Sequence, residues 1–283
     1  MTERRSNRGP EGSEGAAQQV AEVRAVPTTR PPSRRGRFEP GLVAVIARYA
    51  LKACFPTKRR IGLLLPAAGA LLFAVLSQLL PDRAPVALAQ VAGPGLFGVV
   101  LPVGCLVIGD AVLGAEVRSG TLHFTWLSPA SFAAVVAGRW LAGLVVASVA
   151  IVVPFGLAAV VAGVPGAIGP MVLAAAVGSA AYIAVFVLLG ALTRRAVVWS
   201  LGFVVLIERL LATALSGLAQ WSPGWEARAV YAELGPGAYN TLHRAGVPEG
   251  GDAIVRLLII AAVALVVSAV RLGHLRMSGP SGD

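Results

Sequence analysis

The sequence predicts an all-α integral membrane protein with six transmembrane helices, a helix on the membrane surface before them, and both chain termini in the cytoplasm. Of the residues, 56% are hydrophobic and 13% are charged, whereas soluble domains carry about 25% charged residues. The apolar residues fall in long runs, and residues 140–193 contain no Asp, Glu, Lys or Arg. A membrane-crossing helix needs roughly 20 apolar residues. Because these runs do not alternate with polar residues, helices are favoured over a β-barrel.

The amino-terminal part of the chain is unlike the rest. Residues 1–40 are rich in Arg, Pro, Gly, Glu and Ser, which predicts a disordered basic cytoplasmic tail. Residues 41–57 form a weakly amphipathic helix that we expect to lie along the inner membrane surface. Its apolar and neighbouring basic positions are Leu42, Val45, Ile46, Tyr49 and Ala53, with Arg48 and Lys52. The alternative, a helix buried in a soluble domain, is disfavoured because a charge-free run follows almost directly.

Six apolar runs then predict the spans of one transmembrane permease domain, residues 41–276, followed by a short tail at 277–283. The predicted spans are residues 61–80, 95–112, 141–161, 170–192, 196–218 and 253–270. Glycines and a proline between Gly163 and Gly169 predict a tight turn between the third and fourth spans. The loop at 219–252 is long, and its Trp and Tyr residues suit short helices at the outer membrane surface.

The basic residues predict the orientation in the membrane. If the amino terminus is inside, 19 of the 24 Lys and Arg residues lie in inner segments, against three in outer ones, Arg83, Arg228 and Arg244. This asymmetry predicts a multi-pass protein of the cell (cytoplasmic) membrane with both termini cytoplasmic. Basic charge can also indicate nucleic-acid binding, but the tail contains five acidic residues and almost no aromatic ones. We therefore expect the lipid bilayer, and no nucleic acid, as a partner.

The segment Gly114–Ser131, between the second and third predicted spans, is a polar insert broken by turns. Gly114 and Gly120 allow sharp changes of direction, and Ser128 before Pro129 predicts the start of the helix that continues into the third span. The apolar piece between these turns is too short to be stable alone and too apolar for water. A partner protein, the membrane surface or the chain's own bundle must therefore cover it.

This insert resembles the cytoplasmic coupling segment of type-2 ABC transporter permeases, the membrane-spanning subunits of ATP-driven exporters. The resemblance is carried by Glu116, by Gly120-Thr121-Leu122, and by Pro129 nine residues after that glycine. It implies export driven by a separate ABC ATPase subunit, a second permease copy or a homologue as partner, and small external helices between the last two spans. The implied ATPase-contact residues are Glu116, Arg118, Ser119, Gly120, Thr121, Leu122 and Phe124.

Motifs for other chemistry are missing from the sequence. Neither of the two lysines, Lys52 and Lys58, belongs to a Gly-x-x-x-x-Gly-Lys-Ser/Thr loop, so we expect ATP and Mg²⁺ on the partner subunit and no cofactor on this chain. Because Gly-x-Ser-x-Gly and His-Glu-x-x-His motifs are also absent, we do not expect an enzyme. Three scattered histidines predict no metal site.

Charged residues within the spans are the remaining candidates for function. Glu208 and Arg209 fall in the fifth predicted span, where an ionised side chain costs roughly 2.5–3.5 kcal/mol, and Asp110 lies at the inner end of the second. These three residues are candidates for the translocation path. The alternative for Glu208 and Arg209 is a structural ion pair or an arginine that extends to the interface, and for Asp110 an interfacial position. A proton-coupled secondary transporter that uses Glu208 is the alternative function.

Overall fold

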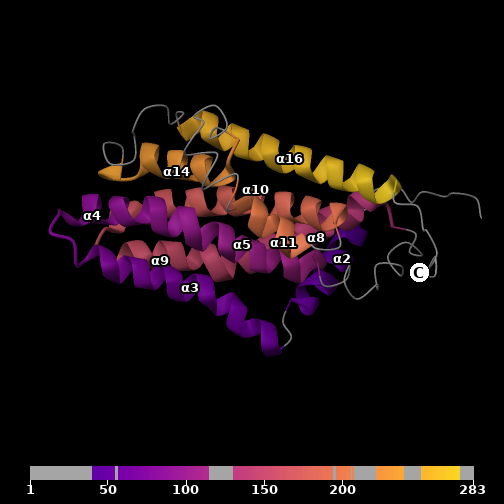
Figure 1. Ribbon diagram of the computed structural model, residues 1–283, viewed down its shortest axis with the longest axis horizontal. Coiled ribbons are helices and arrows are strands. Elements are labelled where there is room, and N and C mark those ends of the chain that lie inside the picture. The colour runs from indigo at the N-terminus through magenta and orange to yellow at the C-terminus, as the bar shows by residue number, and fades with distance from the viewer. Residues whose placement is uncertain are drawn as a thin grey trace, which may run out of the picture. The chain divides into compact units, whose positions relative to one another are not determined.

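All regular structure in the described part of the chain is helical (Figure 1). The structure is a computed structural model that describes residues 40–54, 57–114, 130–193, 196–204, 206, 221–238 and 250–274. All of them belong to one unit of the chain, Arg35–Asp283. No strand occurs among these residues, which confirms the predicted all-helical class. The number of spans and their orientation stay predictions.

Four helical stretches of the described residues are long and apolar enough to cross a membrane. The first is built from α4 (Ala84–Val91), η1 (Ala92–Val100) and α5 (Leu101–Gly109), and it leads into η2 (Asp110–Gly114). The second is built from α8 (Phe132–Ala147), η3 (Ser148–Val152) and α9 (Val153–Val161). The third contains η4 (Pro165–Ala167) and α10 (Ile168–Leu192), and the fourth is α16 (Gly250–His274).

Four further helices complete the described elements. They are α2 (Pro40–Ala53), α3 (Thr57–Ser77), α11 (Ala196–Gly202) and α14 (Pro223–Leu234). The first predicted span corresponds to α3, whose apolar part, Gly62–Ser77, is shorter than the four long stretches. Of the predicted fifth span, 196–218, only the part up to residue 206 is described, apart from residue 205. Its remainder, with Glu208 and Arg209, lies outside the described residues.

Two of the long helices contain a π-helical segment shortly before a proline. The segment η1 ends at Val100, two residues before Pro102, and η3 ends at Val152, two residues before Pro154. A proline inside a helix has no N–H to donate, and its ring clashes with the carbonyl four residues earlier. Widening the preceding turn to π geometry relieves that clash while the helix continues.

Successive long helices run in opposite directions, so distant parts of the sequence meet at two ends of the bundle. At the end that we call the α2 end, α2 packs on α8 and both contact η2. Gly138 of α8 comes so close to α2 that an added Cβ would lie 2.9 Å from the side chain of Ile46. Gly273, near the end of α16, lies beside the ring of Phe132 at the start of α8. The α2 end therefore gathers α2, η2, the start of α8 and the end of α16.

The opposite end, which we call the α14 end, gathers the remaining turns. The Gln78 side chain after α3 donates a hydrogen bond to the Val161 carbonyl at the end of α9. The next residues turn sharply through Gly163, whose φ is 74°. Gly237, just after α14, lies beside Pro85 of α4, because an added Cβ would be 3.2 Å from its side chain.

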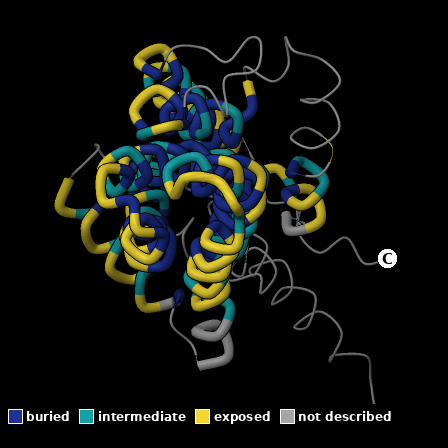
Figure 2. Tube along the Cα trace, turned by 90° about the vertical axis from the view of Figure 1, so that its left-hand side faces the viewer, coloured by how far each residue is buried: buried dark blue, intermediate teal, exposed yellow. Residues whose placement is uncertain are grey.

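The outer faces of the helices are apolar and exposed (Figure 2). The clearest case is α16, whose hydropathy is the highest of the four long stretches although only 28% of its most apolar window is buried. In water, such a large exposed apolar surface would cause the protein to aggregate or to bind a partner. In a bilayer, by contrast, an apolar outer face is expected because it contacts lipid. The buried residues of α10 include the small residues Ala174, Ala175 and Gly178. Small side chains allow neighbouring helices to approach closely. The described residues are thus compatible with a membrane-embedded protein.

Candidate functional site

Most of the site residues predicted from the sequence lie outside the described residues. These are Glu116, Arg118, Ser119, Gly120, Thr121, Leu122 and Phe124 of the insert, together with Glu208 and Arg209. Asp110 is described: it is half-buried and begins η2, at the α2 end. Of the predicted site residues, Asp110 is therefore the one whose position the structure describes.

The two flanks of the insert are described, and both lie at the α2 end. Gly114 ends η2, and Phe132 begins α8, two elements that contact each other at the α2 end. The N-cap of α8 is Ser131, whose Oγ accepts a hydrogen bond from the Ala134 backbone N–H at 3.3 Å. The prediction of a helix running on from Pro129 is wrong, because Ala130 and Ser131 are not helical. A serine cap is used, but it stands three residues later than the sequence pattern indicated.

The helix α8 is fixed to its neighbours directly after this cap. Its Arg139 is buried, and the indole Nε1 of Trp140 donates a hydrogen bond to the Ala180 carbonyl of α10 at 3.0 Å. The opposite face of α8 packs on α2. A displacement of the insert would therefore be passed to α8, and from α8 to α2 and α10.

An ion pair with a buried carboxylate joins α14 to α16. The Nη1 atom of Arg256 lies 3.5 Å from Oε1 of Glu226, whose side chain is 0% exposed, while that of Arg256 is 37% exposed. Ser222 begins α14 as its N-cap and accepts a hydrogen bond from the Trp225 backbone N–H at 3.3 Å. Glu226 therefore lies in the first turn, where the helix dipole favours a negative charge. The pair connects α14, in the loop predicted at 219–252, to the last long helix.

The protonation of Glu226 is sensitive to its surroundings. Burial raises the pKa of its carboxyl from 4.5 to about 7, while the charge and hydrogen bond of Arg256 act to lower it and the charge of Asp252 acts to raise it. Its second oxygen, Oε2, is buried and has no hydrogen-bond partner among the described residues. A buried carboxylate with one free oxygen is costly. Glu226 can therefore take up a proton near neutral pH, which would weaken its attraction to Arg256.

An aromatic row anchors α14 in the core. The ring of Tyr231 lies 5.5 Å from that of Phe97 in η1, and Phe97 lies edge-on to Phe155 of α9 at 5.4 Å. Such pairs contribute beyond the apolar area that they bury. Burial raises the pKa of Tyr231 to about 12, so the phenol stays protonated. The helix α14 is thus packed into the bundle, whereas the aromatic residues of its loop suggested helices at the membrane surface.

The Glu226–Arg256 pair is not predicted by the sequence pattern. The available signals were a glutamate in an otherwise aromatic and small-residue loop and an arginine near the start of an apolar run. Neither residue predicts the other as its partner, because 30 positions in the sequence separate them. Only the antiparallel packing of α14 on α16 brings them together. Among the described residues no group of three His, Cys, Asp or Glu side chains could hold a metal ion.

Comparison with models of known protein families finds no match for this chain, and comparison with curated proteins finds none either. A functional assignment therefore has to come from the sequence pattern and from the geometry of the described residues. Two features are available for it: the flanks of the insert at the α2 end, and the Glu226–Arg256 pair near the α14 end.

Proposed function

We propose that this chain is the membrane-spanning permease subunit of an ATP-driven exporter in the cytoplasmic membrane. In this proposal the chain has six spans with both termini cytoplasmic, and it acts with a second copy or a homologue. A separate ABC ATPase subunit carries ATP and Mg²⁺ and docks on the insert Gly114–Ser131. The ATPase is the expected partner because the insert is polar and resembles a coupling segment.

The observation that carries the proposal is the position of the two flanks of the insert. Both η2 and the start of α8 lie at the α2 end, where α2 contacts η2 and α8, and the end of α16 lies beside Phe132. The neighbouring helices hold exposed basic residues, Arg48 and Lys52 on α2 and Arg271 on α16. Basic residues favour the cytoplasmic face of membrane proteins. This arrangement supports an insert that faces the compartment where ATP is available.

The packing also supports a route for movement. An ATPase that pushes on the insert would act on η2 and α8 together, because both leave the insert directly. Trp140 links α8 to α10, and α10 packs along α16 and α14. The far end of that route contains the Glu226–Arg256 pair. A rigid-body movement of α8 is the kind of change by which packed helices transmit such a push.

Mutation of the insert tests the proposal. We expect co-expression with the partner ATPase to give a complex that exports substrate, and Glu116→Ala combined with Thr121→Ala and Leu122→Ala to abolish both. The matched control is Arg83→Ala, an exposed residue at the α14 end, which should leave complex formation unchanged. If the triple variant still binds the ATPase and still exports in an ATP-dependent way, the docking assignment is wrong.

A proton-coupled secondary transporter is the second candidate, and Glu226 is the observation that favours it. A fully buried carboxyl with a pKa of about 7 can bind and release protons near neutral pH. Glu208, the carboxylate first considered for this role, lies outside the described residues. This candidate predicts flux driven by a pH gradient without any ATPase. Flux that persists in Glu226→Gln would exclude Glu226 as the proton carrier.

A further inference from the structure

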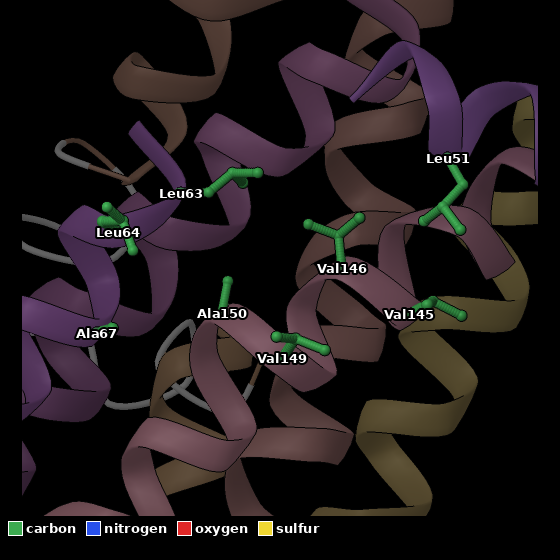
Figure 3. Close-up of a pocket in the computed structure, with 8 residues that line it drawn as sticks. All are labelled: Leu51, Leu63, Leu64, Ala67, Val145, Val146, Val149 and Ala150. Carbon is green, nitrogen blue, oxygen red and sulfur yellow. The ribbon is translucent and has the colours of Figure 1, made fainter. Parts of the chain in front are cut away.

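An apolar groove opens on the side of the bundle between α2, α3 and α8. It has a volume of about 570 Å³, a size typical of sites for small molecules. Leu63 of α3 faces Val146 and Ala150 across the groove, and Leu51 of α2 lies at one end (Figure 3). Every lining side chain is aliphatic, so none can orient a ligand by hydrogen bonding.

The groove exists because α2 and α3 pack against different segments of the bundle. The helix α2 packs on α8, where Gly138 allows Ile46 to come close. The helix α3 packs on α9 and η3, farther along the same long stretch, and makes few contacts with α8 itself. The first turns of α3 therefore diverge from α8 (Figure 1), and the space between them stays open on the side of the bundle.

The end of the groove nearest Leu51 is basic. Lys52 follows Leu51 directly, and Arg48 lies one turn earlier; both side chains are exposed. In the sequence, Lys58, Arg59 and Arg60 occupy the first turn of α3, one turn before the lining residues of that helix. None of the helices α2, α3 and α8 contains an acidic residue. An apolar cleft with basic residues at one end matches a molecule that has an apolar tail and an anionic head.

We infer that this groove holds an acyl chain of an anionic phospholipid from the leaflet at the α2 end, with its phosphate beside Lys52. The aliphatic lining accommodates the tail but gives no preference, because surrounding lipid is equally apolar. The preference comes from the basic residues, since clusters of Lys and Arg at the membrane surface attract anionic headgroups. This inference rests on the membrane embedding in the proposed function and is independent of any ATPase.

Photocrosslinking of the full chain in vesicles tests the inference. The vesicles contain equal parts of phosphatidylglycerol and phosphatidylcholine, and a photoreactive residue replaces Val149, which lines the groove and is 71% exposed. The matched position is Val266 on α16, which is 62% exposed and does not line the groove. Both positions tolerate substitution because neither side chain is buried. Mass spectrometry identifies the lipid attached to each.

We expect adducts at Val149 to be enriched in phosphatidylglycerol and adducts at Val266 to reflect the vesicle composition. Lys52→Gln should reduce the enrichment at Val149 on the order of fivefold, the effect of one basic residue at a membrane surface. Equal enrichment at the two positions, or enrichment that Lys52→Gln leaves unchanged, would overturn the inference. Adducts at Val149 to a second copy of the chain would also overturn it and assign the groove to a protein contact. Lipid adducts at neither position would instead contradict the membrane embedding.

Discussion

Arg256 on the last long helix lies 3.5 Å from the carboxylate of Glu226, which is fully buried in α14. This contact joins α16, which is largely exposed, to α14, which is packed against α10, α16 and η1. Any movement of α14 relative to α16 would therefore change the distance between Glu226 and Arg256. It also gives the chain a group that titrates near neutral pH.

The stability of the folded chain should depend on pH through Glu226. Its pKa is about 7 when folded and 4.5 ordinarily, so the folded state binds the proton more tightly. Its contribution to stability is greatest below the ordinary pKa and falls as the pH rises toward the folded one. The full difference is at most about 3.5 kcal/mol, at about 1.4 kcal/mol per pKa unit. Glu226→Gln should remove this fall, as measured by thermal unfolding in detergent from about pH 5 to about pH 8.

The control for this experiment is Glu233→Gln, which changes an exposed acid on the same helix. It should retain the pH dependence of the original chain. If Glu226→Gln and the original chain lose stability in parallel as the pH rises, the carboxyl of Glu226 is not the titrating group.

Close packing of α14 on α10 depends on Gly178. A Cβ at this position would lie 2.9 Å from the Leu101 side chain and 3.0 Å from the Cβ of Ala227. Gly178→Val should therefore force α14 away from α10, because overpacking a tight contact costs about 1–3 kcal/mol. Hydrogen exchange in α14 should accelerate. Gly169→Ala is the matched control on the same helix, since nothing lies within 4 Å of its added Cβ, and a similar acceleration in that variant would contradict the packing account.

The start of α14 depends on the side chain of Ser222. Its Oγ accepts the Trp225 backbone N–H at 3.3 Å, and replacing such a cap by alanine costs about 1 kcal/mol. We expect Ser222→Ala to lower the thermal stability measured in detergent. Ser148→Ala should have a smaller effect, because its hydroxyl only donates to the Leu144 carbonyl within the same long helix. Equal losses in both variants would show that the cap is not the cause.

The long helices could be predicted from the sequence because each is dominated by an apolar run, as in residues 140–193. The π-helical segments before Pro102 and Pro154 could not, since a proline can also kink or end a helix. The sequence pattern predicts the cap of α8 at Ser128, whereas Ser131 forms it; both serines fit the local preference for an N-cap. Glu226 was missed because its pairing depends on α14 packing against α16.

The candidate site was predictable only in part for the same reason. Polar patterning and spacing predict a docking segment at Gly114–Ser131, because they are local properties of the sequence. The meeting of its flanks with α2 and the end of α16 at one end of the bundle depends on contacts between distant residues. The groove beside Lys52 arises because α3 diverges from α8. The hydropathy of the sequence does not predict the angle between two helices.

The most direct test of the proposed function is crosslinking in intact cells from a single cysteine placed at Ser119, within the insert. The native Cys54 and Cys105, which are buried and form no disulfide, are first replaced by alanine, and a cysteine at Asp82, exposed at the α14 end, provides the comparison. The proposal predicts that Ser119→Cys is shielded from membrane-impermeant reagents added outside and crosslinks to a polypeptide that hydrolyses ATP, whereas Asp82→Cys is labelled from outside. Labelling of Ser119→Cys from outside the cell, or ATP-dependent export with no ATPase attached to it, would contradict the proposal.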